Sequence, residues 1–127
     1  MRVSDSEFAQ LRQMIEAKRK PAQRESVDSE AKWQSEVREL ATLYGYYLQY
    51  HANDSRRSDP GWPDLVLLRP GRTLFIELKT DEGKLTVDQD RWIKGLRANG
   101  HECHVWRPRD REQVLKVLSG KETSDER

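Results

Sequence analysis

Two strand-like runs around a Pro-Gly pair dominate the hydrophobic pattern of the chain. The first run, residues 64–68, is almost continuously apolar, which is typical of a strand covered on both faces. The second, residues 73–79, alternates between apolar and mixed positions, which indicates a strand with two different faces. Pro70-Gly71 between them favours a tight turn. We therefore expect an antiparallel hairpin at the centre of the fold.

Further helices and strands are predicted on both sides of this hairpin. Apolar residues at helical spacing predict helices over residues 4–18, 29–44, 86–99 and 109–119. Aromatic and alternating runs predict strands over residues 46–51 and 102–107. The order α-α-β-β-β-α-β-α predicts an α/β layer fold with a mixed sheet.

Capping residues and linkers suggest how the chain is divided. Ser29 is expected to cap the second helix, and Thr86 with Gln89 reads as a capping box for the third. We expect an N-terminal helix and linker at 1–28, one domain at 29–120 and a polar tail at 121–127. The first helix would either pack on the core or serve a dimer.

Composition narrows the class of protein. The 127 residues carry a net charge of +1 with 35% charged residues, which excludes a uniformly basic nucleic-acid binder but not a basic face. A single cysteine, Cys103, allows no internal disulfide and fits a reducing compartment. We found no signal peptide and no apolar run long enough for a membrane span, so we expect a cytoplasmic protein without membrane association.

The hairpin brings candidate chemistry together at one end of the sheet. If it closes symmetrically, positions that sum to 141 face each other, and Asp64 lies opposite Glu77. Opposed Cβ atoms are about 4.5–5.5 Å apart, where like charges destabilise the pair. Lys79 lies on the same face as Glu77. A divalent cation would turn the repulsion into coordination, whereas the alternative is an exposed strand face with an ion pair.

The second helix offers a further acid. At about 100° per residue, Glu30 lies about 40° from the centre of the apolar stripe, and Glu36 and Glu39 lie about 80° and 140° away. Glu30 is therefore the acid that can face inward, with Gln34 one turn later on the same side. The alternative is an acid placed in the first turn by the helix dipole.

Basic residues near the predicted site are candidates for phosphate contacts. Arg56 and Arg57 lie in the loop before Asp64, and Lys84 and Arg91 lie around the third helix. Either pair could instead belong to an ordinary solvated surface. Gln89 could cap its helix, line the site, or do both. His51, at the end of a strand, is interpreted as a packing residue, and a zinc site at residues 101–104 is not expected because alternation sends Cys103 and His104 to opposite faces.

The ordered motifs Gly61-Trp62-Pro63-Asp64, Ile76-Glu77-Leu78-Lys79-Thr80 and Gln89, with Ser29-Glu30 and Gln34 upstream, carry a family resemblance. Over about residues 29–118 the chain resembles the virus-type replication-repair nuclease family, VRR-NUC, of the PD-(D/E)XK nuclease superfamily. The resemblance implies a restriction-endonuclease-like fold and a phosphodiesterase that depends on Mg²⁺ or Mn²⁺.

The same resemblance implies roles for individual residues. Glu30, Asp64 and Glu77 would be acidic metal ligands, and the Leu78 carbonyl a further one. Lys79 would position or activate the attacking water, or stabilise charge at the phosphate, and Gln89 would orient groups in the site. Glu36 offers a competing register for the helix acid.

The substrate is also implied by the resemblance. Stand-alone members of the family are associated with cleavage of four-way DNA junctions as homodimers, and fused members with flaps and crosslinks. This short chain looks like the stand-alone, phage-type kind, which implies a Holliday-junction resolvase in replication, recombination or repair. The alternatives are a nuclease for flaps, ends or plain duplex, and a catalytically silent DNA-binding scaffold on the same fold.

Overall fold

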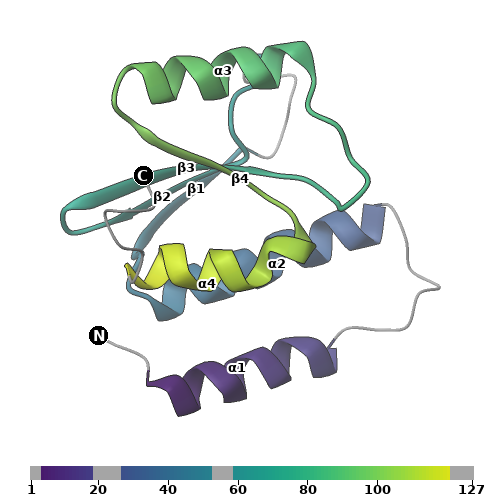
Figure 1. The fold of residues 1–127 in the computed structure, drawn as a ribbon, viewed down its shortest axis with the longest axis vertical. Helices are drawn as coiled ribbons and strands as arrows, with labels where there is room; N and C mark the ends of the chain where they lie inside the picture. The colour runs from purple at the N-terminus through teal and green to yellow at the C-terminus, as the bar shows by residue number, and fades with distance from the viewer. Residues whose placement is uncertain (1–3, 19–26, 53–58, 121–127) are drawn as a thin grey trace.

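The computed structural model describes residues 4–18, 27–52 and 59–120, which form a mixed four-stranded sheet between helices (Figure 1). The strands are β1 (Leu48–His51), β2 (Leu65–Arg69), β3 (Arg72–Leu78) and β4 (Glu102–Trp106). They are ordered β1-β2-β3-β4, with β1, β2 and β3 antiparallel and β4 parallel to β3. The α/β fold with a mixed sheet that the sequence predicts is confirmed.

Helices cover both faces of this sheet. They are α1 (Asp5–Lys18), α2 (Val27–Leu43), α3 (Val87–Ala98) and α4 (Arg111–Ser119), with a short 3-10 helix, η1 (Pro108–Asp110), before α4. Figure 1 shows α3 over one face, α2 and α4 over the other, and α1 outside that pair. No helix in the described ranges is long and apolar enough to span a membrane.

The hairpin of β2 and β3 has the predicted register. Leu65 pairs with Ile76, and Arg69 pairs with Arg72, so each pair of positions sums to 141. The strands differ from the expected ranges by one residue at their ends, because pairing continues to a two-residue turn at Pro70-Gly71. Gly71 takes a positive φ of 80° in this turn, a conformation that glycine adopts without strain.

The main core lies between the sheet and α2 with α4. Alternate residues of β2 and β3 point to this side and are fully buried, namely Leu65, Leu67, Leu74 and Ile76. α2 contributes Trp33, Val37, Leu40 and Ala41, and α4 contributes Val114, Val117 and Leu118. The opposite alternation leaves Asp64 and Glu77 on the face toward α3, which is where the candidate site begins.

The predicted starts of the second helix and of the first strand are wrong, each for a local reason. α2 begins at Val27, so Ser29 lies inside its first turn and is not its N-cap; no glycine or proline at 27–29 stops the helix there. β1 begins at Leu48 because the N–H of Tyr46 donates to the Ala41 carbonyl at the end of α2 instead of joining the sheet. The Tyr46 side chain is buried and donates to the Leu118 carbonyl.

Three other local predictions can be compared with the structure. The capping box of Thr86 and Gln89 at the start of α3 is present. The last helix begins later than expected, at Arg111, since η1 precedes it. α1 packs on the core through Phe8 and Leu11, with the Phe8 ring 5.2 Å from the ring of Tyr44.

Candidate active site

Asp64 and Glu77 form a carboxyl pair where β2 begins and β3 ends. Their carboxyl groups share a hydrogen bond. Glu77 is 2% exposed, and Asp64 Oδ2 also accepts the backbone N–H of Leu78 at 2.8 Å. The predicted juxtaposition of the two acids is therefore present, because the symmetric register places Asp64 next in line after the Leu65–Ile76 pair.

The surroundings of the pair favour its protonated form. Burial raises the pKa of Glu77 to about 8, with a further increase from the charge of Asp64. Burial also raises the pKa of Asp64, although hydrogen bonds from Leu78 and Glu77 oppose that increase. At neutral pH and without a cation, the pair therefore holds one proton between its two carboxyl groups.

Lys79 and His51 lie near this pair. The charge of Lys79, which follows β3 on the same face, lowers the pKa of both carboxyl groups. His51 lies near enough for its charge to lower the pKa of Asp64. The sequence did not predict this position for His51. It results from the pairing of β1 with β2, which sets His51 opposite Leu65 and which the sequence of neither strand reveals by itself.

The structure separates the two candidate acids of α2. Glu30 is exposed in the first turns of α2, and its charge is one cause of the raised pKa of Glu77. Glu36 is buried, and its Oε2 accepts two hydrogen bonds from Arg111, at 3.1 Å from Nε and 3.0 Å from Nη2. Glu36 thus joins α2 to α4, and Glu30 is the helix acid whose charge acts on Glu77.

The donor set of this site fits a hard cation in part. No group of three or more His, Cys, Asp or Glu side chains close enough for one ion occurs among residues 4–18, 27–52 and 59–120. Asp64 and Glu77 offer oxygen ligands from a half-buried and a buried carboxyl group. Mg²⁺ is often held by one or two carboxylates, with water and substrate phosphate completing its shell. The pair fits such a site, while ligation by Glu30 and by the Leu78 carbonyl stays a prediction.

Gln89 has a clear structural use. Its side-chain Oε1 accepts the backbone N–H of Thr86 at 2.9 Å, and its own N–H donates to Thr86 Oγ1 at 3.1 Å. The capping interpretation is therefore confirmed. The role of Gln89 in the site itself stays a prediction.

The basic residues predicted to contact phosphate differ in where they lie. Arg56 and Arg57 lie outside the described residues. Lys84 is exposed between Lys79 and α3. Arg91 is exposed on α3, with Nη1 3.6 Å from Asp88 Oδ1, so part of its charge is already balanced.

Arg107 holds the segment that follows Lys79, a contact that sequence reasoning missed. Its Nη1 donates to the carbonyl of Thr80 at 2.7 Å and to the carbonyl of Gly83. The backbone N–H of Arg109 also donates to Asp81 Oδ1 at 3.0 Å. The end of β4 thus fixes the segment that carries Lys84. No local pattern could predict this, because the partners are 24 to 28 residues apart.

The segment before Asp64 rests on α3. Gly61 has a φ of +91°, and a Cβ there would lie 2.4 Å from the carbonyl carbon of Asp88. Trp62 makes edge contacts with Phe75 and Trp92, with ring centroids 6.0 and 5.1 Å apart. Glycine is thus required for the close approach, and the aromatic rings hold the Gly-Trp-Pro-Asp segment in place.

Comparison with protein families agrees with this arrangement. The model of the VRR-NUC domain matches residues 5–110. The chain belongs to the VRR-NUC family. This match to a nuclease family begins in α1. The resemblance carried by the sequence motifs did not include that helix. A solved structure described as a VRR_NUC domain protein is similar at 20% identity and a TM-score of 0.48, covering 66% of this chain and 83% of that chain. No curated protein matches the chain.

Proposed function

We propose that this VRR-NUC protein is a metal-dependent DNA endonuclease that hydrolyses phosphodiester bonds. The observation that carries the proposal is the pairing of half-buried Asp64 with buried Glu77, with Lys79 on the same face. A protein that only bound DNA would gain nothing from two acids next to a polyanion, whereas a cation bridges such acids to phosphate. Membership of the VRR-NUC family supports the same class of reaction.

In this proposal, Asp64 and Glu77 hold Mg²⁺, or Mn²⁺ in its place, with the Leu78 carbonyl as a further ligand. Glu30 would be another ligand and would have to move closer to the pair when the ion binds, since the three acids do not form one ion-sized group without it. The bound ion would polarise a phosphoryl oxygen and lower the pKa of its water. Asp64 is oriented for this role by the Leu78 N–H, which fixes one carboxylate oxygen. Glu77 is oriented by burial and must release its proton for the cation to enter.

Lys79 supplies positive charge beside the scissile phosphate. Its effect on both carboxyl groups supports an electrostatic role. Lys79→Arg keeps the charge but removes a group that can act as a base, whereas Lys79→Met removes both. We expect Lys79→Met to lower kcat far more than it lowers DNA affinity, and Lys79→Arg to keep part of kcat. Equal loss in both variants would instead favour general-base chemistry.

The substrate that we propose is a branched DNA, with a four-way junction first. The net charge of +1 means that one chain offers few phosphate contacts. A homodimer doubles these contacts and places two sites on symmetry-related strands, which paired nicking of a junction requires. Lys84 and Arg91, together with Arg56 and Arg57, are the candidate contacts.

The decisive experiment incubates the purified protein with labelled four-way junction, flap, duplex and single-stranded DNA in Mg²⁺, Mn²⁺ or EDTA. We expect cleavage only with a divalent cation, and loss of cleavage with retained DNA binding in Asp64→Asn and Glu77→Gln. Glu39→Gln, an exposed acid of α2, is the matched control and should keep activity. Substantial activity in either site variant would refute the site.

A second experiment tests the dimer and the junction. Sedimentation with and without junction should show two protomers, and nick mapping on all four strands should show paired, near-symmetric cuts. A strict monomer that cuts one strand of a flap would reject the resolvase proposal and leave a flap nuclease of the same chemistry.

A further inference from the structure

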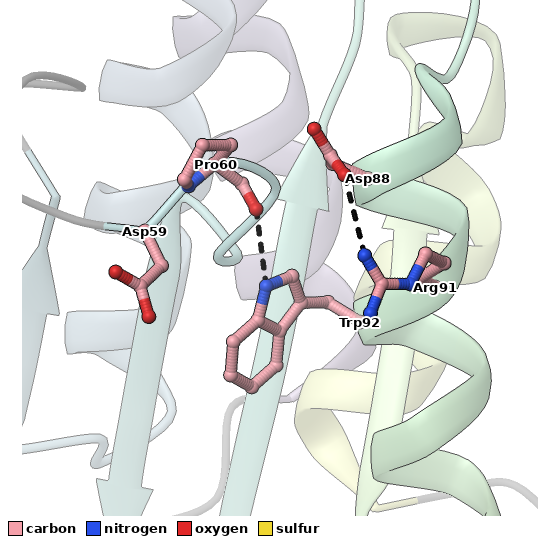
Figure 2. A pocket seen from close by; sticks show the side chains of 5 residues that line it. All are labelled: Asp59, Pro60, Asp88, Arg91 and Trp92. Carbon is pink, nitrogen blue, oxygen red and sulfur yellow. Dashed lines mark hydrogen bonds and ion pairs between the residues drawn. The ribbon is translucent and has the colours of Figure 1, made fainter.

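An open cavity lies between Asp59-Pro60, in the segment that leads to Asp64, and the first turns of α3 (Figure 2). Its volume is about 420 Å³, within the range of pockets that take small organic groups. It is lined by Asp59, Pro60, Asp88, Arg91 and Trp92. The Trp92 ring is held in place because its Nε1–H donates to the Pro60 carbonyl at 3.1 Å.

The cavity is connected to the acid pair by aromatic rings. Trp92 contacts Trp62, two residues before Asp64, and Trp62 contacts Phe75, two residues before Glu77. Phe75 and Glu77 share a face of β3, so they are separated by about 6–7 Å along the strand. These ring contacts run from the acid pair to the cavity, so a DNA strand bound at the acid pair can extend along them to the cavity.

The charges around the cavity indicate which part of a nucleotide it suits. Among its described lining residues, two acids, Asp59 and Asp88, flank the cavity, and Arg91 lies 3.6 Å from Asp88. A phosphate would be repelled by these carboxylates. A nucleobase has a flat face that stacks on an indole and amino groups that donate to carboxylates.

We propose that this cavity binds an unpaired DNA base next to the cleaved phosphate. The inference rests on the proposed nuclease function and adds a substrate feature to it: a nucleotide outside the duplex, such as one at a branch point. Trp92 provides the stacking surface, and Asp59 with Asp88 accepts hydrogen bonds from the amino group of the base. Cytosine has such an amino group and thymine does not, so the cavity prefers cytosine.

The test measures binding without cleavage. Glu77→Gln protein in EDTA is titrated with one duplex that carries a single unpaired cytosine, with the same duplex carrying an unpaired thymine, and with the fully paired duplex. We expect the order cytosine, thymine, paired, from tightest to weakest. Adding Trp92→Leu should weaken binding to the unpaired cytosine about tenfold and leave the paired duplex almost unchanged.

Three further variants keep the test decisive. Trp92→Phe retains a flat ring and should keep most of the affinity for the unpaired base. Asp59→Asn, at an exposed position, should reduce the preference for cytosine over thymine severalfold without disturbing the Trp62 contact. Val87→Ala, 78% exposed on the same helix and outside the cavity lining, is the control and should change nothing.

Two results would overturn the proposal: equal binding of paired and unpaired DNA by the parent protein, or no effect of Trp92→Leu and Asp59→Asn on the unpaired substrates. Because binding is measured with an inactive variant and no metal, failure of the nuclease proposal would leave these results unaffected. Failure of the base site would likewise leave cation-dependent cleavage intact.

Discussion

The indole N–H of Trp33 donates to the backbone carbonyl of Trp106 over 3.0 Å, and the same carbonyl accepts the backbone N–H of Lys79 at 3.1 Å. Trp33 is 1% exposed and lies one turn after Glu30 on α2. One peptide carbonyl therefore joins the helix that carries Glu30 to the strand end that carries Lys79. The position of the helix acid relative to the carboxyl pair depends on this contact.

Trp33→Phe should loosen that connection. The variant loses the hydrogen bond and some buried volume, so we expect the free energy of unfolding to fall by about 2 kcal/mol. Activity should fall as well, measured as kcat/KM over a Mg²⁺ titration. Trp106→Phe is the matched control, since it also removes core volume but keeps the backbone carbonyl. An equal loss of activity in both variants would contradict the positioning role of Trp33.

The stability of the metal-free protein should depend on pH through Glu77. Its pKa is raised from 4.5 to about 8 on folding, so the folded state holds a proton that the unfolded state has lost between these values. The contribution of Glu77 to the free energy of unfolding is therefore fully present below about pH 4.5. It falls between pH 4.5 and about 8, and it is lost above about pH 8. Asp64, whose pKa is also raised, acts in the same direction.

Glu77→Gln removes this dependence because its amide does not titrate. Thermal melts in EDTA at pH 5, 7 and 9 should show a steeper decline for the parent than for the variant, with the variant the more stable at pH 9. Mg²⁺ should stabilise the parent most at high pH, where it does not compete with the proton. Identical pH profiles of the two proteins would show that Glu77 is not the buried titrating group.

Substitution of Glu30 should lower turnover, whereas substitution of Glu36 should lower stability. Glu36→Gln breaks a buried ion pair with Arg111, so we expect a loss of about 3 kcal/mol in urea unfolding with cation-dependent turnover largely kept. Glu30→Gln, at an exposed position, should leave the unfolding curve unchanged and reduce turnover. The reverse pattern would assign the metal role to Glu36.

Local patterns predicted the parts of the fold that depend on short-range rules. The Pro-Gly turn fixes the register of the hairpin, and the register alone places Asp64 beside Glu77. The capping box at Thr86 likewise requires only residues three apart. The start of β1 was predicted wrongly because Tyr46 is used by the end of α2 and by the core, which its aromatic neighbours in sequence do not indicate.

The supports of the site could not be predicted in this way. The Trp33–Trp106 and Glu36–Arg111 contacts join residues 73 and 75 positions apart. They exist only because α2 packs against both α4 and the end of β4. The place of His51 near Asp64 follows from β1 pairing with β2. The sequence thus predicts the candidate groups, and tertiary packing decides how they are held.

Gly61 provides the sharpest test of how the Gly-Trp-Pro-Asp segment is positioned. Gly61→Ala would place a methyl group 2.4 Å from the carbonyl carbon and oxygen of Asp88, at a φ of +91° that an alanine rarely adopts. Backbone atoms of α3 cannot rotate away as a side chain would, so α3 and the segment before Asp64 must separate. Overpacking and strain together predict a loss of about 3 kcal/mol in the free energy of unfolding.

Gly71→Ala isolates the strain, because its φ is +80° but a Cβ there meets nothing within 4 Å, and it should cost only about 1 kcal/mol. Cleavage assays under conditions where both variants are folded should show a large loss for Gly61→Ala, since Asp64 moves with its segment, and near-normal turnover for Gly71→Ala. Similar stability and activity in the two variants would mean that contact with α3 does not position Asp64.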